Sequence, residues 1–210
     1  MTLAHESLAE KVKQAILERV VDGTYPPGTR LVELALAREF GVSQGPVREA
    51  LRELAGARLV ATLPRRGGTF VRATTQEDMA EVYLVRAALE ETAGRYAIQA
   101  LRADPSPLHR ALGRMRRAAD ADDVVELVRG SVEFHRTVVA AAGNRLLLEI
   151  WDSLHLEART LATVVRGHVD LHAAAEAHVP LVEAFERGEP ELCARLLAEH
   201  QHRYRELPQD

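Results

Sequence analysis

Three histidines in the second half of the chain lie on the apolar faces of separate predicted helices. His135 follows Val128 and Ser131 at helical spacing, and His178 and His200 hold equivalent positions on two later segments. Neutral imidazole is the commonest side-chain ligand for transition metals, because one ring nitrogen keeps a free lone pair. If the three apolar faces meet in one core, the rings form a site for a divalent metal.

For each ring the alternative is a hydrogen-bonded core histidine that binds nothing. A single inward histidine favours this alternative, whereas three on separate helices favour a shared site. His155, one turn after Trp151, is a further candidate for the same interior. The stripes alone do not establish that the three faces converge.

Helices must hold these rings. From Thr75 onward every long segment has helical periodicity, and Asp78 three residues later completes a pattern typical of a capping box. Proline and glycine mark the breaks, and Asn144, next to Gly143, is expected to end a helix in a left-handed conformation. We expect helices at about 76–102, 106–119, 122–142, 144–166, 170–187 and 190–205.

Composition and charge limit the class of protein. The 210 residues are 47% hydrophobic, Cys193 is the single cysteine, and no apolar run reaches the roughly 20 residues that a membrane helix needs. Residues 1–73 hold 11 Lys and Arg against 8 Asp and Glu, a net of +3, while residues 74–210 hold 16 against 23, a net of -7. We therefore expect a cytoplasmic protein that binds no membrane, with nucleic-acid binding confined to a basic N-terminal part.

The first 73 residues predict a separate module. Apolar positions at four-residue intervals indicate a helix over 6–21, and shorter helices are expected at about 31–40 and 44–56 around a turn at 41–43. Residues 59–72 indicate two strands around a glycine-containing turn, the only β-structure expected. This order is that of a winged helix-turn-helix.

The third of these helices carries side chains that could read DNA. Gln44, Arg48 and Arg52 share its outer face, where arginine can pair with guanine and glutamine with adenine in the major groove. At the hairpin tip, Arg65 and Arg66 precede Gly67 and could enter the minor groove or meet phosphate. The alternative is a solvated face of ion pairs, Arg48 with Glu49 and Arg52 with Glu53.

Residues 8–73 resemble the DNA-binding domain of the GntR superfamily of bacterial transcription regulators. The motifs that carry the resemblance are PPGTRL, GVSQGPVREAL and RRGGTFV. Family members most often have Arg and Thr after the serine of the turn, where this chain has Gln44 and Gly45. The resemblance implies DNA binding through this module, and the departure implies an operator sequence different from that of relatives.

Residues 76–210 resemble the FCD effector domain of the FadR-type branch. The segments VYLVRAALEETAGRYA, VEFHRTVVAAAGNRLLLEIW and AHVPLVEAFERGEPELCARLLAEH carry this likeness. It implies an antiparallel all-helical bundle, a homodimer, a zinc or nickel ion on three histidines and an aspartate, and a cavity for a small carboxylate. His135, His178 and His200 match three ligands, and Ser131 occupies the aspartate position.

Ser131 changes the expected chemistry, because a hydroxyl is a poor metal ligand. Three imidazoles can still hold zinc with an open position for water or an effector carboxylate. The alternative is that the metal has been lost and the histidines contact an anion directly. Glu133 cannot replace the aspartate, since it lies two residues from His135 on the far side of the helix.

Arg86 lies on the face of Met79 and Tyr83 and matches a family arginine that borders the effector cavity. The alternative for it is an ion pair with Glu90 one turn later. Asn144 and His155 complete the candidates for effector contact beside Arg86 and Ser131.

The sequence thus predicts a mainly α-helical DNA-binding regulator, not an enzyme. Residues 1–73 would bind a pseudo-palindromic operator as a homodimer, and residues 74–210 would bind a small organic acid, with or without metal. A repressor is favoured over an activator. One rival is a regulator that senses metal alone. Another is a zinc-dependent hydrolase, against which no Glu or Asp could be assigned beside the cluster as a general base.

Overall fold

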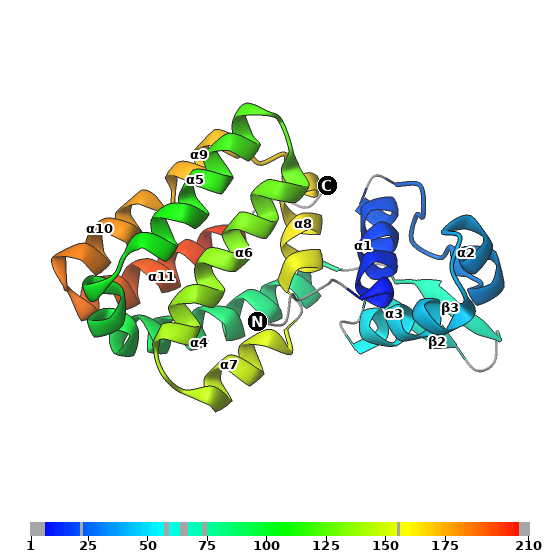
Figure 1. Cartoon of the computed structure of the whole chain (residues 1–210), viewed down its shortest axis with the longest axis horizontal. Coiled ribbons are helices and arrows are strands. Elements are labelled where there is room, and N and C mark those ends of the chain that lie inside the picture. Colours follow the sequence, from blue (N-terminus) through cyan, green and yellow to red (C-terminus); the bar gives the residue numbers. More distant parts are fainter. Residues whose placement is uncertain are drawn as a thin grey trace. The chain divides into compact units, whose positions relative to one another are not determined.

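The computed structural model describes residues 7–21, 23–56, 59–63, 67–72, 75–154 and 156–205. The chain divides into two compact units, Met1–Thr74 and Thr75–Asp210 (Figure 1).

Unit 1 is a three-helix winged fold. Helix α1 spans Leu8–Val21, α2 spans Glu33–Glu39 and α3 spans Gln44–Gly56 (Figure 1). Strands β1 (Arg30–Leu31), β2 (Val60–Leu63) and β3 (Gly68–Val71) form an antiparallel sheet in the order β1-β3-β2. The expected β-structure was incomplete, because β1 pairs only two residues with β3 and is too short for an alternating pattern to reveal it.

The core of unit 1 forms where α1 packs against α3. Ile16 of α1 is fully buried, as are Val47, Ala50 and Leu54 on the inner face of α3. This burial fixes the rotation of α3 about its axis, so the opposite face of α3 is exposed to solvent.

Unit 2 is all helical. Its elements are α4 (Gln76–Ala103), α5 (Ser106–Asp120), α6 (Val124–Ala141), α7 (Arg145–Asp152), α8 (Leu156–Arg166), α9 (Leu171–Glu176), α10 (Val179–Arg187) and α11 (Pro190–Arg205). Thr75 and Asp78 form the expected capping box at the start of α4. Helix α11 packs along α4, and α6 packs against α4 and α5 (Figure 1).

Small residues bring α4 and α11 close together. A Cβ on Gly94 would lie 2.7 Å from Leu197 Cδ1 and 3.1 Å from the backbone nitrogen of Ala194. A larger side chain at position 94 would push the two helices apart. This close contact therefore sets the distance between α4 and α11, and with it the spacing of the interior residues that the two helices carry.

Two of the expected helices are each divided into two. The segment at 170–187 breaks between α9 and α10 because Pro180 lies in the first turn of α10, where its ring would clash with the carbonyl of Glu176 if the helix were continuous. His178 accordingly lies at this break and not inside a helix. The segment at 144–166 also divides, into α7 and α8, and α7 ends at Asp152 with Ser153 as its C-cap.

The expectation for Asn144 as a left-handed helix cap was wrong. Gly143 adopts the left-handed conformation, with φ of 70°, while Asn144 has φ of -104°. Glycine takes that conformation without a steric cost, which leaves Asn144 free to cap the next helix. Its side-chain oxygen accepts a hydrogen bond from the Leu147 backbone nitrogen at 3.1 Å and begins α7.

Candidate functional site

The outer face of α3 carries the polar side chains expected to contact DNA. Gln44, Gly45, Arg48 and Arg52 are all exposed. Gln44 and Gly45 are the first two residues of α3, where backbone N–H groups have no partner within the helix. A Cβ on Gly45 would meet nothing closer than 3.9 Å, so the glycine leaves open space at this end of the helix. The face is accessible to a nucleic-acid groove or a phosphate.

Arg48 is held by an acidic residue of α2. Its Nη2 donates to Glu33 Oε2 at 2.9 Å and its Nε donates to the same carboxylate at 3.1 Å. The hydrogen bond from Arg48 lowers the pKa of Glu33, and Arg52 adds to this effect through its charge. The pair is solvent-exposed, so its contribution to stability is small and Arg48 can exchange it for another acceptor.

The alternative of an ion-paired face along α3 named partners that differ from the observed ones. Arg48 pairs with Glu33 rather than Glu49, and Glu53 pairs with Lys13 of α1 at 2.9 Å rather than with Arg52. Each observed pair joins α3 to another helix. Their contact depends on how the helices pack, which helical spacing within α3 does not reveal.

The wing has a basic residue that the sequence patterns did not single out. Arg30 of β1 donates from Nη2 to the carbonyl oxygen of Gly67, and a Cβ on Gly68 would lie 2.8 Å from Arg30 Nε. Gly67 has φ of 59°, which favours glycine there. Arg30 thus lies against the end of the β2–β3 hairpin. Arg65 and Arg66, both predicted to contact DNA, lie outside the described residues.

The three predicted metal-binding histidines meet inside unit 2. The ring centroids lie 5.2 Å apart for His135 and His178, 5.0 Å for His135 and His200, and 4.5 Å for His178 and His200. One nitrogen from each ring lies within 4.8 Å of one from each of the others, and all three side chains are buried. The rings come from α6, from the break before α10 and from α11.

Hydrogen bonds orient two of these rings for metal binding. His135 Nδ1 lies 2.8 Å from Glu90 Oε2, and His178 Nδ1 lies 2.9 Å from the carbonyl oxygen of Ala174. Since both partners only accept, each Nδ1 carries the proton and each Nε2 keeps its lone pair. In metal sites, a ligand histidine usually donates its other ring N–H to a carboxylate or a carbonyl, and these acceptors form the outer shell of the site.

The three rings are held in the neutral form that a metal requires. Burial lowers the pKa of His135, lowers that of His178 to about 3, and places that of His200 well below its ordinary value. The positive charge of Arg86 lowers all three further. Geometry, tautomer and charge therefore all fit a divalent ion such as zinc.

Glu90 is the residue that sequence reasoning missed. Its carboxylate accepts from Arg86 Nε at 2.7 Å, Trp151 Nε1 at 2.9 Å and Gln201 Nε2 at 2.8 Å, besides its contact with His135. Burial raises the pKa of Glu90, but the charge of Arg86 and the hydrogen bonds from His135 and Arg86 outweigh this and lower it to about 2. A carboxylate does stand beside the cluster, contrary to the reasoning from sequence.

The signal for Glu90 was its position on α4. Met79, Tyr83, Arg86 and Glu90 are spaced by four and three residues, and all four are buried. The Arg86–Glu90 pair, which the sequence offered only as an alternative to effector contact, is thus an interior pair. Arg86 also donates from Nη1 to Thr160 Oγ1 at 3.4 Å.

The other predicted effector residues have different surroundings. Ser131 is buried, and its Oγ lies 3.3 Å from His178 Nε2, so it borders the cluster. Asn144 is exposed, and its side-chain oxygen caps α7. His155 lies outside the described residues.

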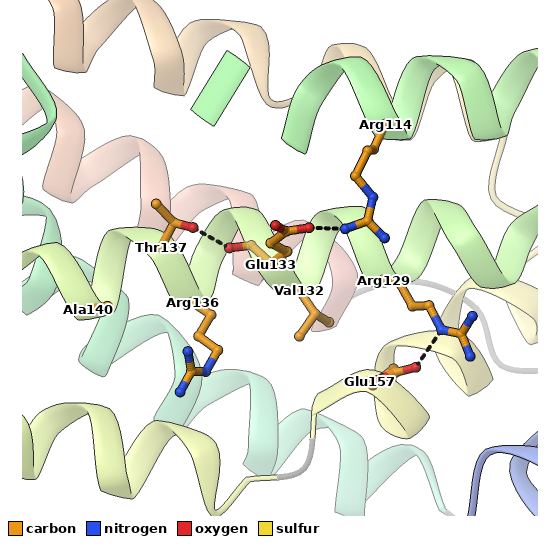
Figure 2. A pocket seen from close by; sticks show the side chains of 8 residues that line it. All are labelled: Arg114, Arg129, Val132, Glu133, Arg136, Thr137, Ala140 and Glu157. Atoms are coloured by element: carbon orange, nitrogen blue, oxygen red, sulfur yellow. Dashed lines mark hydrogen bonds and ion pairs between the residues drawn. The ribbon is translucent and has the colours of Figure 1, made fainter. Parts of the chain in front are cut away.

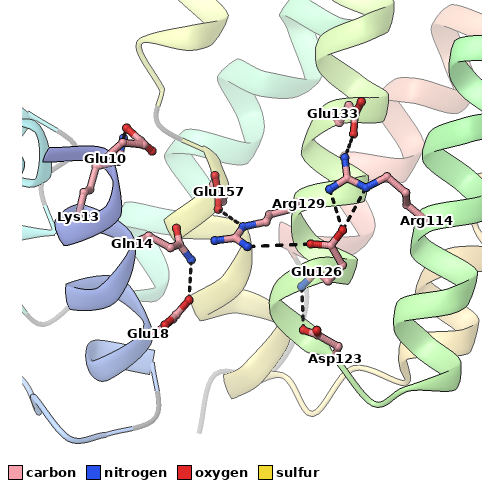
Figure 3. Close-up of polar contacts among 10 residues, drawn as sticks. All are labelled: Glu10, Lys13, Gln14, Glu18, Arg114, Asp123, Glu126, Arg129, Glu133 and Glu157. Carbon is pink, nitrogen blue, oxygen red and sulfur yellow. Dashed lines mark hydrogen bonds and ion pairs between the residues drawn. The ribbon is translucent and has the colours of Figure 1, made fainter. Parts of the chain in front are cut away.

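A separate polar pocket of about 490 Å³ opens on the outside of unit 2. Figure 2 shows Arg114, Arg129 and Arg136 around it, with Glu133 directed toward Arg114 and Glu157 toward Arg129. Figure 3 shows that Glu126 contacts both Arg114 and Arg129, and Arg136 is bound by both oxygens of Asp152. The arginines of this pocket are therefore already bound to carboxylates, and Glu133 points away from the histidine cluster, as expected.

Within the described residues, no helix combines the length and the apolar character that crossing a membrane requires.

Comparisons with known proteins identify both units. Residues 8–71 match the model described as "Bacterial regulatory proteins, gntR family", and residues 81–203 match the FCD domain. The "Probable D-xylose utilization operon transcriptional repressor" of Paenarthrobacter nicotinovorans is 35% identical over 94% of this chain and 87% of its own length. The "Gluconate operon transcriptional repressor" of Bacillus licheniformis is 32% identical over 72% of this chain and 62% of its own length.

The fold has a solved counterpart. The structure titled "E. coli McbR/YncC" covers 94% of this chain and 94% of its own with a TM-score of 0.74, at 24% identity. The comparisons confirm the helical fold, the winged helix-turn-helix and the non-enzymatic class, so the hydrolase reading is set aside. The chain belongs to the GntR family of bacterial regulatory proteins, and it is a ligand-modulated, DNA-binding transcription regulator with a C-terminal FCD domain.

Proposed function

We propose that the protein is a homodimeric repressor that binds a pseudo-palindromic operator and responds to a small carboxylate in unit 2. The observation that carries this proposal is the buried cluster of His135, His178 and His200 next to the guanidinium of Arg86, in a chain that also has an exposed recognition helix. The names of the two relatives support repression as the sign of regulation. Operator binding in a bacterium implies a cytoplasmic location.

Unit 1 supplies the operator contacts. Arg48 reads a base in the major groove after it leaves Glu33, while the exposed start of α3 at Gln44 and Gly45 approaches the phosphate backbone. Arg52 contacts phosphate, and Arg65, Arg66 and Gly67 of the wing approach the minor groove. Gln44 and Gly45 make this operator differ from those of relatives that carry Arg and Thr there.

Unit 2 supplies the effector site. His135, His178 and His200 would hold a zinc or nickel ion, which would give the effector carboxylate a Lewis-acid position. Ser131 stands where relatives have an aspartate ligand, so it brings no negative charge. Glu90 supplies that charge by contacting Nδ1 of His135, and it is not itself a ligand. Arg86, Ser131 and His155 are the proposed effector residues, whereas Asn144 caps α7.

An exposed apolar face supports the homodimer. Leu84, Val85 and Tyr96 lie on one side of α4, and they are 51%, 45% and 70% exposed. Leu146 and Ile150 of α7, which packs against α4, are 63% and 42% exposed. Exposed large apolar side chains on adjoining helices are typical of a protein–protein interface. A second copy would cover this face and place two α3 helices on two half-sites.

Elemental analysis of purified protein tests the metal. The wild type should carry a divalent ion that the His135→Ala/His178→Ala double variant lacks. A matched control is His109→Ala/His172→Ala, because these rings are 52% and 67% exposed and each pairs with a surface carboxylate. Equal metal content in all three proteins would contradict the assignment of the ligands.

Operator binding then separates the effector regulator from the metal sensor. At a constant metal concentration, added carboxylates should release the protein from DNA sites that were selected from a random library. Release by metal alone, with no response to any carboxylate, would instead establish the metal sensor.

A further inference from the structure

Two large apolar side chains are exposed at the start of α2, on the DNA-binding unit. Val32 is 44% exposed and Leu34 is 45% exposed, and they stand two residues apart. Single apolar side chains scattered over a surface are ordinary and need no explanation. The described part of unit 1 leaves nearly half of each of these two side chains uncovered, which makes the start of α2 a candidate contact surface.

The first of these residues is a poor choice for the stability of α2. Val32 is the N-cap of the helix, and its side chain makes no capping hydrogen bond. Serine, threonine, aspartate and asparagine are preferred at this position because they accept from the free N–H groups of the first turn, which valine cannot do. Val32 therefore forgoes a local gain in stability, and a contact with a molecule outside unit 1 would account for that choice.

Glu33, between the two apolar residues, places them beside the recognition helix. Its Oε2 lies 2.9 Å from Nη2 of Arg48, and α2 packs against α3 (Figure 1). Consecutive Cα atoms are about 3.8 Å apart, and stacked base pairs are about 3.4 Å apart. When Arg48 contacts a base, the start of α2 therefore lies within about three base pairs of it. The apolar pair is continuous with the face that carries Arg48.

The chemistry of leucine then limits what this surface can recognise. We propose that Leu34, flanked by Val32, contacts the 5-methyl group of a thymine in the major groove of the operator. The thymine methyl is the only methyl group that the four bases present there, and apolar side chains recognise it by excluding water from it. Leucine has no donor or acceptor for the polar groups of a base edge. Leu34 is thus a specificity-determining residue for the operator, and this inference rests on the proposed function.

Replacement of thymine by uracil in the operator tests this contact, because it removes the methyl group and leaves every hydrogen-bonding group of the base in place. An operator is selected from a random library with the wild-type protein, and Arg48→Ala identifies the base pair that Arg48 reads. Each thymine within about three base pairs of it is then replaced in turn. Uracil at one of these positions should weaken wild-type binding about three- to tenfold, the effect expected for burial of one methyl group.

A variant assigns the effect to Leu34. Leu34→Ala should bind the thymine and uracil operators within about 1.5-fold of each other, because the shortened side chain no longer buries the methyl group. The variant should fold like the wild type, since Leu34 is exposed. Leu8→Ala is the matched control, because Leu8 is 58% exposed at the start of α1, and this variant should keep the wild-type preference for thymine.

Two outcomes overturn the thymine contact and leave the proposed function intact. Equal binding of the thymine and uracil operators by the wild type, or a selected operator without thymine in this range, would show that no methyl group is contacted there. A preference for thymine that persists in Leu34→Ala would assign the methyl contact to another side chain. A protein that selects no operator, or an Arg48→Ala variant with unchanged specificity, would count against the proposed function as well.

Discussion

His135 Nδ1 lies 2.8 Å from Glu90 Oε2, and both side chains are fully inaccessible to solvent. Glu90 also binds Arg86, so one carboxylate neutralises a buried guanidinium and orients one ring of the histidine cluster. The charge balance of the core and the orientation of the histidine cluster therefore depend on the same side chain.

Replacing Glu90 by Gln should destabilise the protein by about 3–5 kcal/mol, since Arg86 would remain as an uncompensated buried charge. Metal affinity should fall about 10–100-fold, because His135 loses the carboxylate that orients it. Urea unfolding measures the first effect and metal titration the second. Glu91→Gln is the control, since Glu91 forms a partly exposed pair with Arg95 and should change stability by less than about 0.5 kcal/mol. Equal behaviour of the two variants would contradict the role of Glu90.

Arg48 and Arg52 should differ in what they contribute to DNA binding. Arg48→Ala should cost about 1–3 kcal/mol at a selected operator and weaken discrimination at one base pair. Arg52→Ala should weaken binding to all sequences alike and reduce the salt dependence by about one phosphate contact. Neither change should lower the unfolding temperature, because both side chains are exposed. Competition assays with substituted operators at several salt concentrations measure both effects, and unchanged specificity in Arg48→Ala would remove it from base recognition.

The exposed apolar face of α4 should hold the dimer. Leu84→Asp would place a charge among the apolar side chains of two copies and should convert the dimer to monomers. Sedimentation velocity measures this change. Val32→Asp, at a 44% exposed position of unit 1, should stay dimeric. A Leu84→Asp protein with wild-type sedimentation would place the interface elsewhere.

Cys193 should resist thiol reagents in the native state. Its side chain is fully buried, and burial raises the pKa of the thiol to about 12, so the reactive thiolate is scarce near neutral pH. Labelling should require opening of unit 2 and should become faster as pH rises. Saturating zinc should slow it further if the ion binds only the folded form. Mass spectrometry of the labelled protein follows the rate, and fast labelling in native buffer would mean that this part of the core opens readily.

Helical spacing predicted that the three histidines face inward, because it shows which side of a segment is apolar, but it did not establish that the three faces converge. Spacing placed His135, Arg86 and Ser131 in the interior, and all three are buried. It did not reveal that Glu90 contacts His135, since that contact joins α4 to α6 and depends on packing between helices. The same limit explains the unforeseen pair of Arg48 and Glu33, on α3 and α2.

Local patterns also missed short or interrupted elements. Strand β1 has two residues, too few for an alternating pattern, and the break at Pro180 was hidden by apolar spacing that continues across it. The contact of Gln201 with Glu90 was not predicted, because the apolar stripe on α11 was assigned to the neighbouring His200. Gln201 follows Cys193 and Leu197 at four-residue intervals on α11, and this spacing indicates that its side chain faces inward.

The central claim is that acid binding in unit 2 and operator binding in unit 1 are energetically coupled. Linkage requires each ligand to change the affinity of the other by the same factor. The most direct measurement is the affinity for the tightest-binding acid with and without saturating operator, beside the affinity for operator with and without that acid. The account predicts that both ratios are equal and lie in the range of about 5–150. Acid affinity that is unchanged by operator would contradict it.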